Sequence, residues 1–287
     1  MSDILSIAEA LLKASAIAFM LGNLLAIGLE ADLKAALTPL RDLRFVLTAT
    51  LLGCLFCPAY AWLISQVLPL APPYTTGLLL IGLAPAAPFL PMVVRRAGGD
   101  LAYTVAFMLI AAICTILLMP LAVPRIVPGL SVDPWTVANP LLELVLLPMA
   151  VGMAVRTVAP FIAVRLLKIV KPIASAATVL LLVAVGVRYF EGFVGSVGGY
   201  AIAAQLLYAV GLVVGTYVLS AGMAASQRSV LCLGVCSRNL GAVLALLLVT
   251  PVDPRAMVMV ALAVPITFGV TYLAAGWLSN RAKREYR

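Results

Sequence analysis

Long apolar runs alternate with short polar or Gly- and Pro-containing segments along the whole chain. A helix needs about 20 mainly apolar residues to cross roughly 30 Å of hydrocarbon. Runs of this kind predict nine membrane-spanning helices, in chain order Leu11–Leu29, Phe45–Leu68, Thr76–Val94, Leu101–Val123, Thr136–Val155, Pro172–Val187, Tyr200–Ala221, Ser229–Val249 and Ala256–Leu278. The pattern therefore predicts an all-α membrane protein.

The connections between these runs are short and contain residues that end helices, such as Gly98, Gly99 and Asp100. None is long enough for a soluble module, so we expect residues 1–287 to form one transmembrane domain. Composition agrees, because 64% of the residues are hydrophobic and 10% are charged, whereas soluble domains are about half apolar and a quarter charged. No short apolar stretch with a small-residue cleavage site precedes the first run, so we expect that run itself to insert.

The basic residues are distributed unevenly between alternate connections. One set of connections holds Lys34, Arg41, Arg44, Arg95, Arg96, Arg156, Arg165, Lys168, Lys171, Arg228, Arg281, Lys283, Arg284 and Arg287. The other set holds Arg125, Arg188 and Arg255. Since an excess of Lys and Arg marks the cytoplasmic side, the N-terminus is predicted outside and the C-terminus in the cytoplasm. We expect a bacterial inner membrane, and the net charge of +8 reflects mainly this orientation.

Several classes of chemistry lack their sequence signatures. The chain has no histidine, no phosphate-binding G-x-x-x-x-G-K-[ST] loop and no G-x-S-x-G motif, so we expect neither an enzyme nor nucleotide binding, and no cofactor. Nucleic-acid binding would need a basic patch on a soluble surface. The five cysteines all fall inside predicted spans, where we expect them to pack as small apolar residues and not to form a disulfide framework. Cys54 and Cys57 share a helical face, which leaves metal binding as a weaker alternative.

Two of the predicted spans are interrupted. The third contains Pro85, Pro88 and Pro91. The eighth contains Gly234, Ser237, Arg238, Asn239 and Gly241. Proline removes a backbone donor and clashes with the preceding turn, so a straight helix is not expected. Interruptions at corresponding places of two halves are typical of transporters built from inverted repeats, whose broken helices cross near mid-membrane. We expect such a crossing close to Pro88 and Arg238; the alternative is a proline kink with an arginine buried for packing.

Two stretches around these interruptions resemble a known family. The run from Gly82 to Pro120 resembles, without gaps, the crossover segment of the bile acid:sodium symporter family, and LGVCSRNLGAVLALLL from Leu233 onward resembles its second crossover. The runs FMLGNLLAIGLEADL from Phe19, CPAYAW from Cys57 and VLLPMAVGM from Val145 are also similar. The resemblance implies a core domain, formed in part by the spans near 76–123 and 200–278, and a panel domain from the remaining spans. A substrate cavity is then expected between them, beside the crossing.

The departures from this family concern sodium. The family binds two sodium ions with polar side chains at the crossover, and the aligned positions here hold Gly53, Leu90, Pro91, Thr104, Met108, Gly234 and Arg238. Sodium needs several hard oxygen ligands. Only Thr104 retains one, and Asn239 is kept beside Arg238. We therefore expect no metal and no sodium requirement.

Arg238 is the main candidate functional residue. A guanidinium at membrane depth costs roughly 2.5–3.5 kcal/mol on insertion scales, so it indicates a functional site. It can satisfy the carbonyls of broken helices in place of a cation, or bind a substrate carboxylate or sulfonate, and both interpretations stay open. Ser237 and Asn239 can line the same cavity, or can pack between helices without a ligand.

Three further charged residues have open interpretations. Glu143 lies inside a predicted span and can pair with Arg238, carry a coupling proton, or face water near the outer surface. Arg95 and Arg96 can anchor the inner end of the third span or attract an anionic substrate. We expect a carrier of small or amphipathic organic anions that works by alternating access. The alternatives are a proton-coupled carrier that uses Glu143, and a transport-inactive membrane protein that senses a ligand.

Overall fold

The computed structural model describes residues 2–31, 34, 37–126, 133, 135, 139, 142–249 and 252–285. Within these residues, the helices in chain order are α1 (Ser2–Glu30), η1 (Thr38–Arg41), α3 (Leu43–Thr50), η2 (Leu51–Phe56), α4 (Cys57–Val67), α5 (Pro72–Leu83), α6 (Leu90–Arg96), α7 (Leu101–Ile126), η3 (Leu142–Leu146), α9 (Leu147–Val158), α10 (Pro160–Arg188), α11 (Phe190–Gly195), α12 (Ala201–Leu219), α13 (Ala225–Cys236), α14 (Leu240–Val249) and α15 (Pro254–Glu285). The described part contains no β-strand, so the predicted all-α fold is confirmed.

Five helical segments are long and apolar enough to cross a membrane. They are Leu43–Val67, Leu101–Ile126, Pro160–Arg188, Ala201–Leu219 and Pro254–Arg284, and a shorter apolar helix covers Ala14–Glu30. The first of the five joins α3, the π-helical segment η2 and α4 into one continuous helix. The third and eighth predicted spans are divided, as expected, between α5 and α6 and between α13 and α14. The fifth falls on η3 and α9, and part of it lies outside the described residues.

The predicted start of the sixth span at Pro172 is wrong. Helix α10 begins at Pro160, whose fixed backbone angle suits the first turn, and Pro172 lies inside it. The positive side chains Arg165, Lys168 and Lys171 predict a connection at the membrane surface. Long basic side chains can instead extend along a helix toward the aqueous interface, so the helix continues through this segment.

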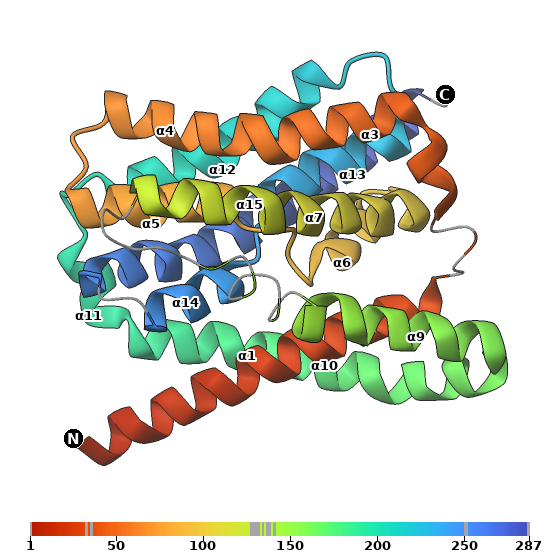
Figure 1. The fold of residues 1–287 in the computed structure, drawn as a ribbon, viewed down its shortest axis with the longest axis horizontal. Coiled ribbons are helices and arrows are strands. Elements are labelled where there is room, and N and C mark those ends of the chain that lie inside the picture. The colour runs from red at the N-terminus through yellow and green to blue at the C-terminus, as the bar shows by residue number, and fades with distance from the viewer. Residues whose placement is uncertain are drawn as a thin grey trace.

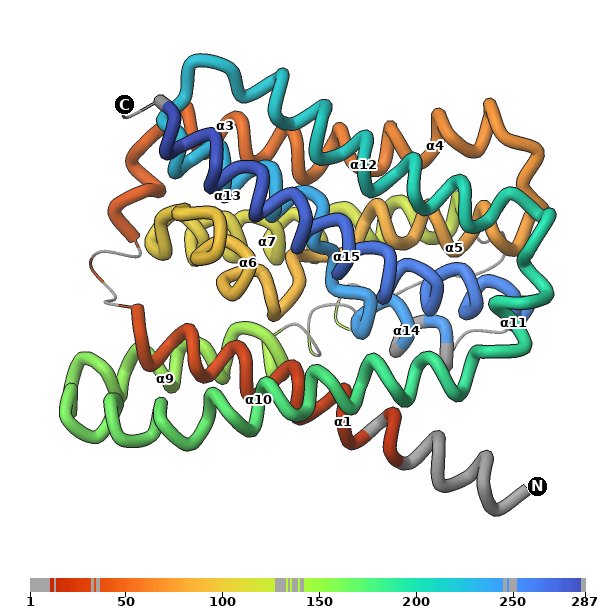
Figure 2. The backbone as a smooth tube through the Cα atoms, turned by 180° about the vertical axis from the view of Figure 1, so that it is seen from behind, coloured from red at the N-terminus to blue at the C-terminus, as the bar shows by residue number. Residues whose placement is uncertain are grey.

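The helices form two layers (Figure 1). Helices α1, α9 and α10 make a separate layer, which we call the three-helix layer; α3 to α7 and α12 to α15 make the larger layer (Figures 1 and 2). In the three-helix layer α1 packs along both α9 and α10. Its backbone touches α9 at a pair of glycines: a Cβ added to Gly28 would lie 2.2 Å from the Met149 carbonyl, and one added to Gly152 would lie 2.7 Å from that of Leu25.

The span Phe45–Leu68 packs within the larger layer and not in the three-helix layer. Helices α3 and α4 pack against α5, α7 and α12, inside the larger layer. Small residues on α12 make this contact close, because a Cβ added to Gly211 would lie 2.1 Å from the Tyr60 hydroxyl oxygen and one added to Gly215 would lie 2.7 Å from the Phe56 ring. Tyr60 also donates a hydrogen bond to the Leu207 carbonyl at 3.2 Å.

Two cysteines depart from the expectation of simple packing. Cys54 on η2 and Cys114 on α7 form a disulfide, with Cα atoms 5.9 Å apart. The expectation was wrong for this pair because the two positions are 60 residues apart and only the packing of η2 on α7 brings them together. Cys57, Cys232 and Cys236 are free and buried, as predicted. Among the described residues no group of three or more potential metal ligands is formed.

Candidate functional site

The two broken helices meet at their interruptions. Helix α5 ends at Leu83 and α6 begins at Leu90, while α13 ends at Cys236 and α14 begins at Leu240. The extended segments between them pair in antiparallel fashion through a bridge of Ala86 and Arg238. The Ala87 amide donates to the Ser237 carbonyl at 2.8 Å, and the Asn239 amide donates to the Pro85 carbonyl at 2.8 Å. The expected contact between two broken spans is therefore present.

The prolines explain why the first helix breaks here. Pro85 lies in the extended segment, where its own missing N–H group does not interrupt a helical hydrogen bond. Pro91 lies in the first turn of α6, where the backbone N–H groups have no helical acceptor and proline is favoured. Pro88 lies between them and is buried next to the crossing. The residues from Gly82 to Leu90 are buried throughout, so the break lies deep inside the protein.

Arg238 fills the crossing with its guanidinium group. The side chain is buried, with 2% of its surface exposed. Its Nη2 donates to the Gly53 carbonyl at 2.6 Å and to that of Gly82 at 3.4 Å, and its Nη1 donates to the Ala84 carbonyl at 3.1 Å. The last carbonyls of a helix lack intrahelical partners and carry partial negative charge, so a cation is favourable at the end of α5.

Phe107 on α7 occupies the space in front of two glycines close to this guanidinium. A Cβ added to Gly234 would lie 2.6 Å from the Phe107 ring, and one added to Gly53 would lie 3.9 Å from it. The ring itself is fully buried. A methyl group at Gly234 would therefore require the ring to move, whereas one at Gly53 would be in ordinary van der Waals contact with it. Phe107 was not singled out from the sequence, because an apolar residue in an apolar helix carries no signal of its own.

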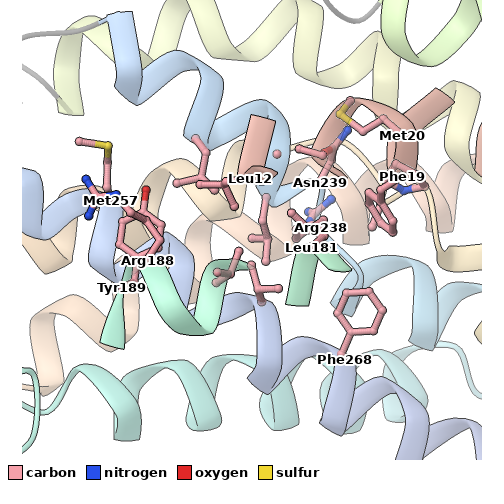
Figure 3. A pocket seen from close by; sticks show the side chains of 18 of the residues that line it. Leu12, Phe19, Met20, Leu181, Arg188, Tyr189, Arg238, Asn239, Met257 and Phe268 are labelled. Carbon is pink, nitrogen blue, oxygen red and sulfur yellow. The ribbon is translucent and has the colours of Figure 1, made fainter. Parts of the chain in front are cut away.

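A pocket of about 430 Å³ lies between the three-helix layer and the crossing (Figure 3). Helix α1 contributes Leu12, Phe19 and Met20, and α15 contributes Met257 and Phe268. The crossing contributes Pro88, Arg238 and Asn239. The end of α10 contributes Leu181 and Arg188, followed by Tyr189. A pocket of this size, mainly apolar with a few polar groups, is typical of a small-molecule site.

The polar groups beside the crossing are only partly satisfied. Asn239 is 1% exposed; its Oδ1 accepts from the Ala242 amide at 3.2 Å, while its Nδ2 has no partner among the described residues. The hydroxyl of Ser237 and the Nε of Arg238 also lack partners there. Buried donors without partners are unfavourable. Asn239 and Arg238 line the pocket whereas Ser237 does not, so the Nδ2 of Asn239 and the Nε of Arg238 are the unpaired groups beside it.

Comparison with known proteins identifies the family. The family model described as Sodium Bile acid symporter family matches residues 17–195. The chain belongs to the sodium bile acid symporter family. The resemblance stated from the sequence is thereby confirmed. The match includes the first broken helix, α5 and α6, and ends before α13 and α14. None of the curated proteins compared with the chain matches it significantly. Together with the long apolar helices, the family supports an integral membrane transporter.

Three of the positions that the resemblance places at sodium sites are packed in the core or already hydrogen-bonded. Leu90 and Met108 are buried in the apolar core of the larger layer. The hydroxyl of Thr104 donates to the Asp100 carbonyl in its own helix at 2.7 Å. Neither Thr104 nor Pro91 lines the pocket.

Glu143 lies away from the Arg238 guanidinium in this symporter-family chain. The hydrogen-bond acceptors of the Arg238 guanidinium in the described part are backbone carbonyls, and Glu143 is not among them. Glu143 is exposed on η3, and it does not line the pocket although the neighbouring Leu144 does. The contact between Glu143 and Arg238 that we considered is therefore absent, and Glu143 faces outward from the protein.

An ion-pair cluster joins the two layers away from the pocket. Glu30, the last residue of α1, pairs with Arg95 at the end of α6 and with Lys171 on α10. Lys171 and Arg188 are 17 residues apart on α10, or roughly 25 Å along a helix, so the cluster lies far from Arg188. Glu30 was missed in the sequence because a single carboxylate at the end of an apolar run resembles an ordinary interface residue.

Proposed function

We propose that this protein is a secondary transporter that moves a small or amphipathic organic anion by alternating access, without coupling to sodium. The observation that carries the proposal is the apolar pocket between the two layers, which ends at a crossing already occupied by the Arg238 guanidinium. The three-helix layer would serve as the panel and the larger layer as the core. The paired interruptions of α5–α6 and α13–α14 support two halves related as inverted repeats.

Electrostatics at the crossing supports sodium independence. Three carbonyls that point into the crossing, those of Gly53, Gly82 and Ala84, already accept hydrogen bonds from Arg238. A second positive charge 4 Å from the guanidinium would be repelled by about 4 kcal/mol at an effective dielectric constant of about 20. The aligned side chains at Gly53, Leu90, Met108 and Gly234 provide no oxygen ligand to offset this repulsion.

The location of the ion pairs supports alternating access. The pocket lies beside residues 12–20 of α1 and the end of α10, whereas the Glu30 cluster joins the last residue of α1, and α10, to α6. With the N-terminus outside, as the basic residues predict, the pocket faces the outer side and the ion pairs close the cytoplasmic side. Opening to the cytoplasm would require the contact between Glu30 and Arg95 to break. The distribution of basic residues also supports an inner-membrane location with a cytoplasmic C-terminus.

Within this proposal Asn239 hydrogen-bonds to the solute. Its Nδ2 is a buried donor without a partner, and it lies where the pocket meets the crossing. Arg238 acts differently, because its terminal nitrogens are engaged by backbone carbonyls; it supplies fixed charge and holds the broken helices together. No contact in the described part favours proton coupling through Glu143.

Uptake into proteoliposomes tests the proposal. Purified protein is reconstituted and uptake of a labelled bile acid and of smaller labelled carboxylates is measured, once with equal sodium on both sides and once with an inward sodium gradient. We expect saturable uptake of at least one anion at the same rate in both conditions. Uptake that occurs only with the gradient would overturn sodium independence, and saturable binding without flux would indicate a ligand sensor instead of a carrier.

A further inference from the structure

Arg188 lies at the mouth of the pocket, at the opposite end from the crossing. It is the last residue of α10, is exposed, and lines the pocket together with Tyr189. Figure 3 shows Arg188 beside Tyr189 and Met257, well separated from Asn239 and Met20 at the other end. The pocket thus has an exposed guanidinium at one end, and the Asn239 amide beside the buried Arg238 at the other.

The charge of Arg188 is not neutralised by the described part of the protein. Its guanidinium lies 5.3 Å from the centroid of the Tyr189 ring, and no described carboxylate lies within ion-pair distance of it. Glu191 also lines the pocket but does not form an ion pair with Arg188. Arg255 provides the contrast, because its guanidinium is held by Asp253 with Nη2 and Oδ2 2.7 Å apart, and Arg255 does not line the pocket.

The sequence makes this arginine conspicuous for a separate reason. Arg188 is one of three basic residues in the set of connections predicted to face outside, where Lys and Arg are otherwise depleted. Orientation in the membrane therefore does not account for its presence. A guanidinium presents a planar fork of donors that matches a carboxylate or sulfonate with two parallel hydrogen bonds.

The rest of the pocket wall is mainly apolar and partly aromatic. Phe89 and Phe268 stack with ring centroids 4.0 Å apart, and the Phe19 ring lies 6.4 Å from each of them. Leu12, Met20 and Leu181 complete this part of the pocket. A rigid apolar body would lie against this surface without losing hydrogen bonds to water, because it has none to lose.

We propose that Arg188 selects the solute by its charge: the carboxylate or sulfonate of an elongated amphipathic anion pairs with Arg188, while the apolar body extends inward and an acceptor at its far end reaches Asn239. This inference rests on the proposed function and adds the orientation of the solute. It also separates the roles of two arginines. Arg238 holds the crossing together through backbone carbonyls, and Arg188 recognises the anion.

The test compares charged and uncharged forms of one probe. Cholate and the corresponding neutral primary amide are titrated calorimetrically into the full-length protein in detergent, using wild type, Arg188→Gln, Arg188→Lys and Arg255→Gln. We expect wild type to prefer cholate by about tenfold or more, because a charge-assisted pair is replaced by a neutral contact. Arg188→Gln should lose that preference, because cholate binds more weakly while binding of the amide is unchanged. Arg188→Lys should retain part of the preference, and Arg255→Gln should behave as wild type.

The outcomes separate this inference from the proposed function. Arg188→Gln could weaken the binding of cholate and of the amide equally, or could keep the preference for cholate. In either case Arg188 does not distinguish the charged probe from the neutral one, and the inference is wrong while the proposed function stands. If wild type binds neither probe and transports neither, the substrate class in the proposed function fails, and this inference fails with it. The melting temperature of each variant, measured without ligand, shows whether a loss of binding reflects misfolding.

Discussion

The Nη2 atom of Arg238 donates a hydrogen bond of 2.6 Å to the carbonyl of Gly53. This bond connects the interruption between α13 and α14 to η2, a π-helical segment within the continuous helix 43–67. A π-helical turn shifts the pattern of backbone hydrogen bonds and is common at functional sites. The same guanidinium reaches the end of α5. One side chain therefore fixes three elements of the larger layer relative to one another.

Replacing Arg238 tests this role. Arg238→Ala would leave the carbonyls of Gly53 and Ala84 buried without their donor, and hydrogen bonds to charged groups contribute about 1.5–3 kcal/mol each. We expect a marked fall in melting temperature and loss of flux. Arg238→Lys should retain part of both, because an ammonium restores the charge but not the planar fork. Flux and melting temperature are measured on the same preparations, and an alanine variant with wild-type stability would contradict the role described here.

The packing of Phe107 against Gly234 gives a second prediction. Gly234→Ala places a methyl group 2.6 Å from the Phe107 ring and should cost about 1–3 kcal/mol, as overpacking does. Phe107→Leu alone should be mildly destabilising. In the double variant the two costs should not add, because the smaller side chain makes room for the methyl group. Denaturation of the four proteins completes the cycle, and simple additivity would show that the two positions do not compete for the same space.

Breaking the ion pairs of Glu30 should favour opening at the cytoplasmic end. Arg95 is 43% exposed, so the pair is worth no more than about 1 kcal/mol. Glu30→Gln should therefore shift the conformational equilibrium by up to about fivefold. Spin labels at Met92 and Ile173, both exposed, report the distance between α6 and α10. We expect a larger fraction of long distances in Glu30→Gln than in wild type or in the control Asp253→Asn, and unchanged distributions would exclude a gating role.

The hydrogen bonds of Asp42 predict that part of the protein's stability depends on pH in the acid range. Asp42 precedes the span that starts at Leu43, and its carboxylate accepts hydrogen bonds from the Phe45 backbone amide, the Tyr103 hydroxyl and the Gln227 side chain. The pKa of Asp42 is lowered below 3.8, mainly by the hydrogen bond from the Phe45 backbone amide. A lowered pKa means that this stabilisation is complete above the unfolded value of about 3.9 and is lost as the pH falls through the folded value. Asp42→Asn should flatten the dependence of melting temperature on pH below about 4. An unchanged dependence would show that Asp42 is not responsible.

Topology is tested independently of transport. A reporter fused after Arg287 should be active on the cytoplasmic side, and one inserted between Pro124 and Pro134 should be active on the outer side. The reverse pattern would overturn the orientation and, with it, the outward-facing pocket. The prediction uses the basic residues of the sequence and does not depend on any contact in the structure.

Features with a local cause were predictable from the sequence. Pro85, Pro88 and Pro91 indicated the break because proline acts on its own backbone, and Arg238 was conspicuous because of the cost of burying a charge among lipid-facing segments. Features that depend on packing were not. The sequence does not show that Phe107 faces Gly234, that Cys54 reaches Cys114, or that Glu30 meets Arg95, since each pair is brought together by helices distant in the chain.

The early start of α10 and the location of the span Phe45–Leu68 illustrate two other limits. A run of basic residues has the same composition in a loop and along a helix that extends beyond the hydrocarbon, so Lys168 and Lys171 did not distinguish them. The layer to which an apolar helix belongs depends on which of its neighbours has small residues at the contact. For the continuous helix 43–67 those neighbours are Gly211 and Gly215, more than 140 residues later in the chain.

A charge that is built into the chain cannot be released on the far side of the membrane. If Arg238 replaces the coupling ion, the protein has no coupled ion gradient from which to draw work, and each cycle carries the charge of the solute alone. A potential of 100 mV, negative inside, is worth about 2.3 kcal/mol per elementary charge. A monovalent anion would then reach equilibrium at a roughly forty-fold lower concentration in the cytoplasm than outside. Under resting conditions such a carrier would export anions or exchange one for another, and would not accumulate them.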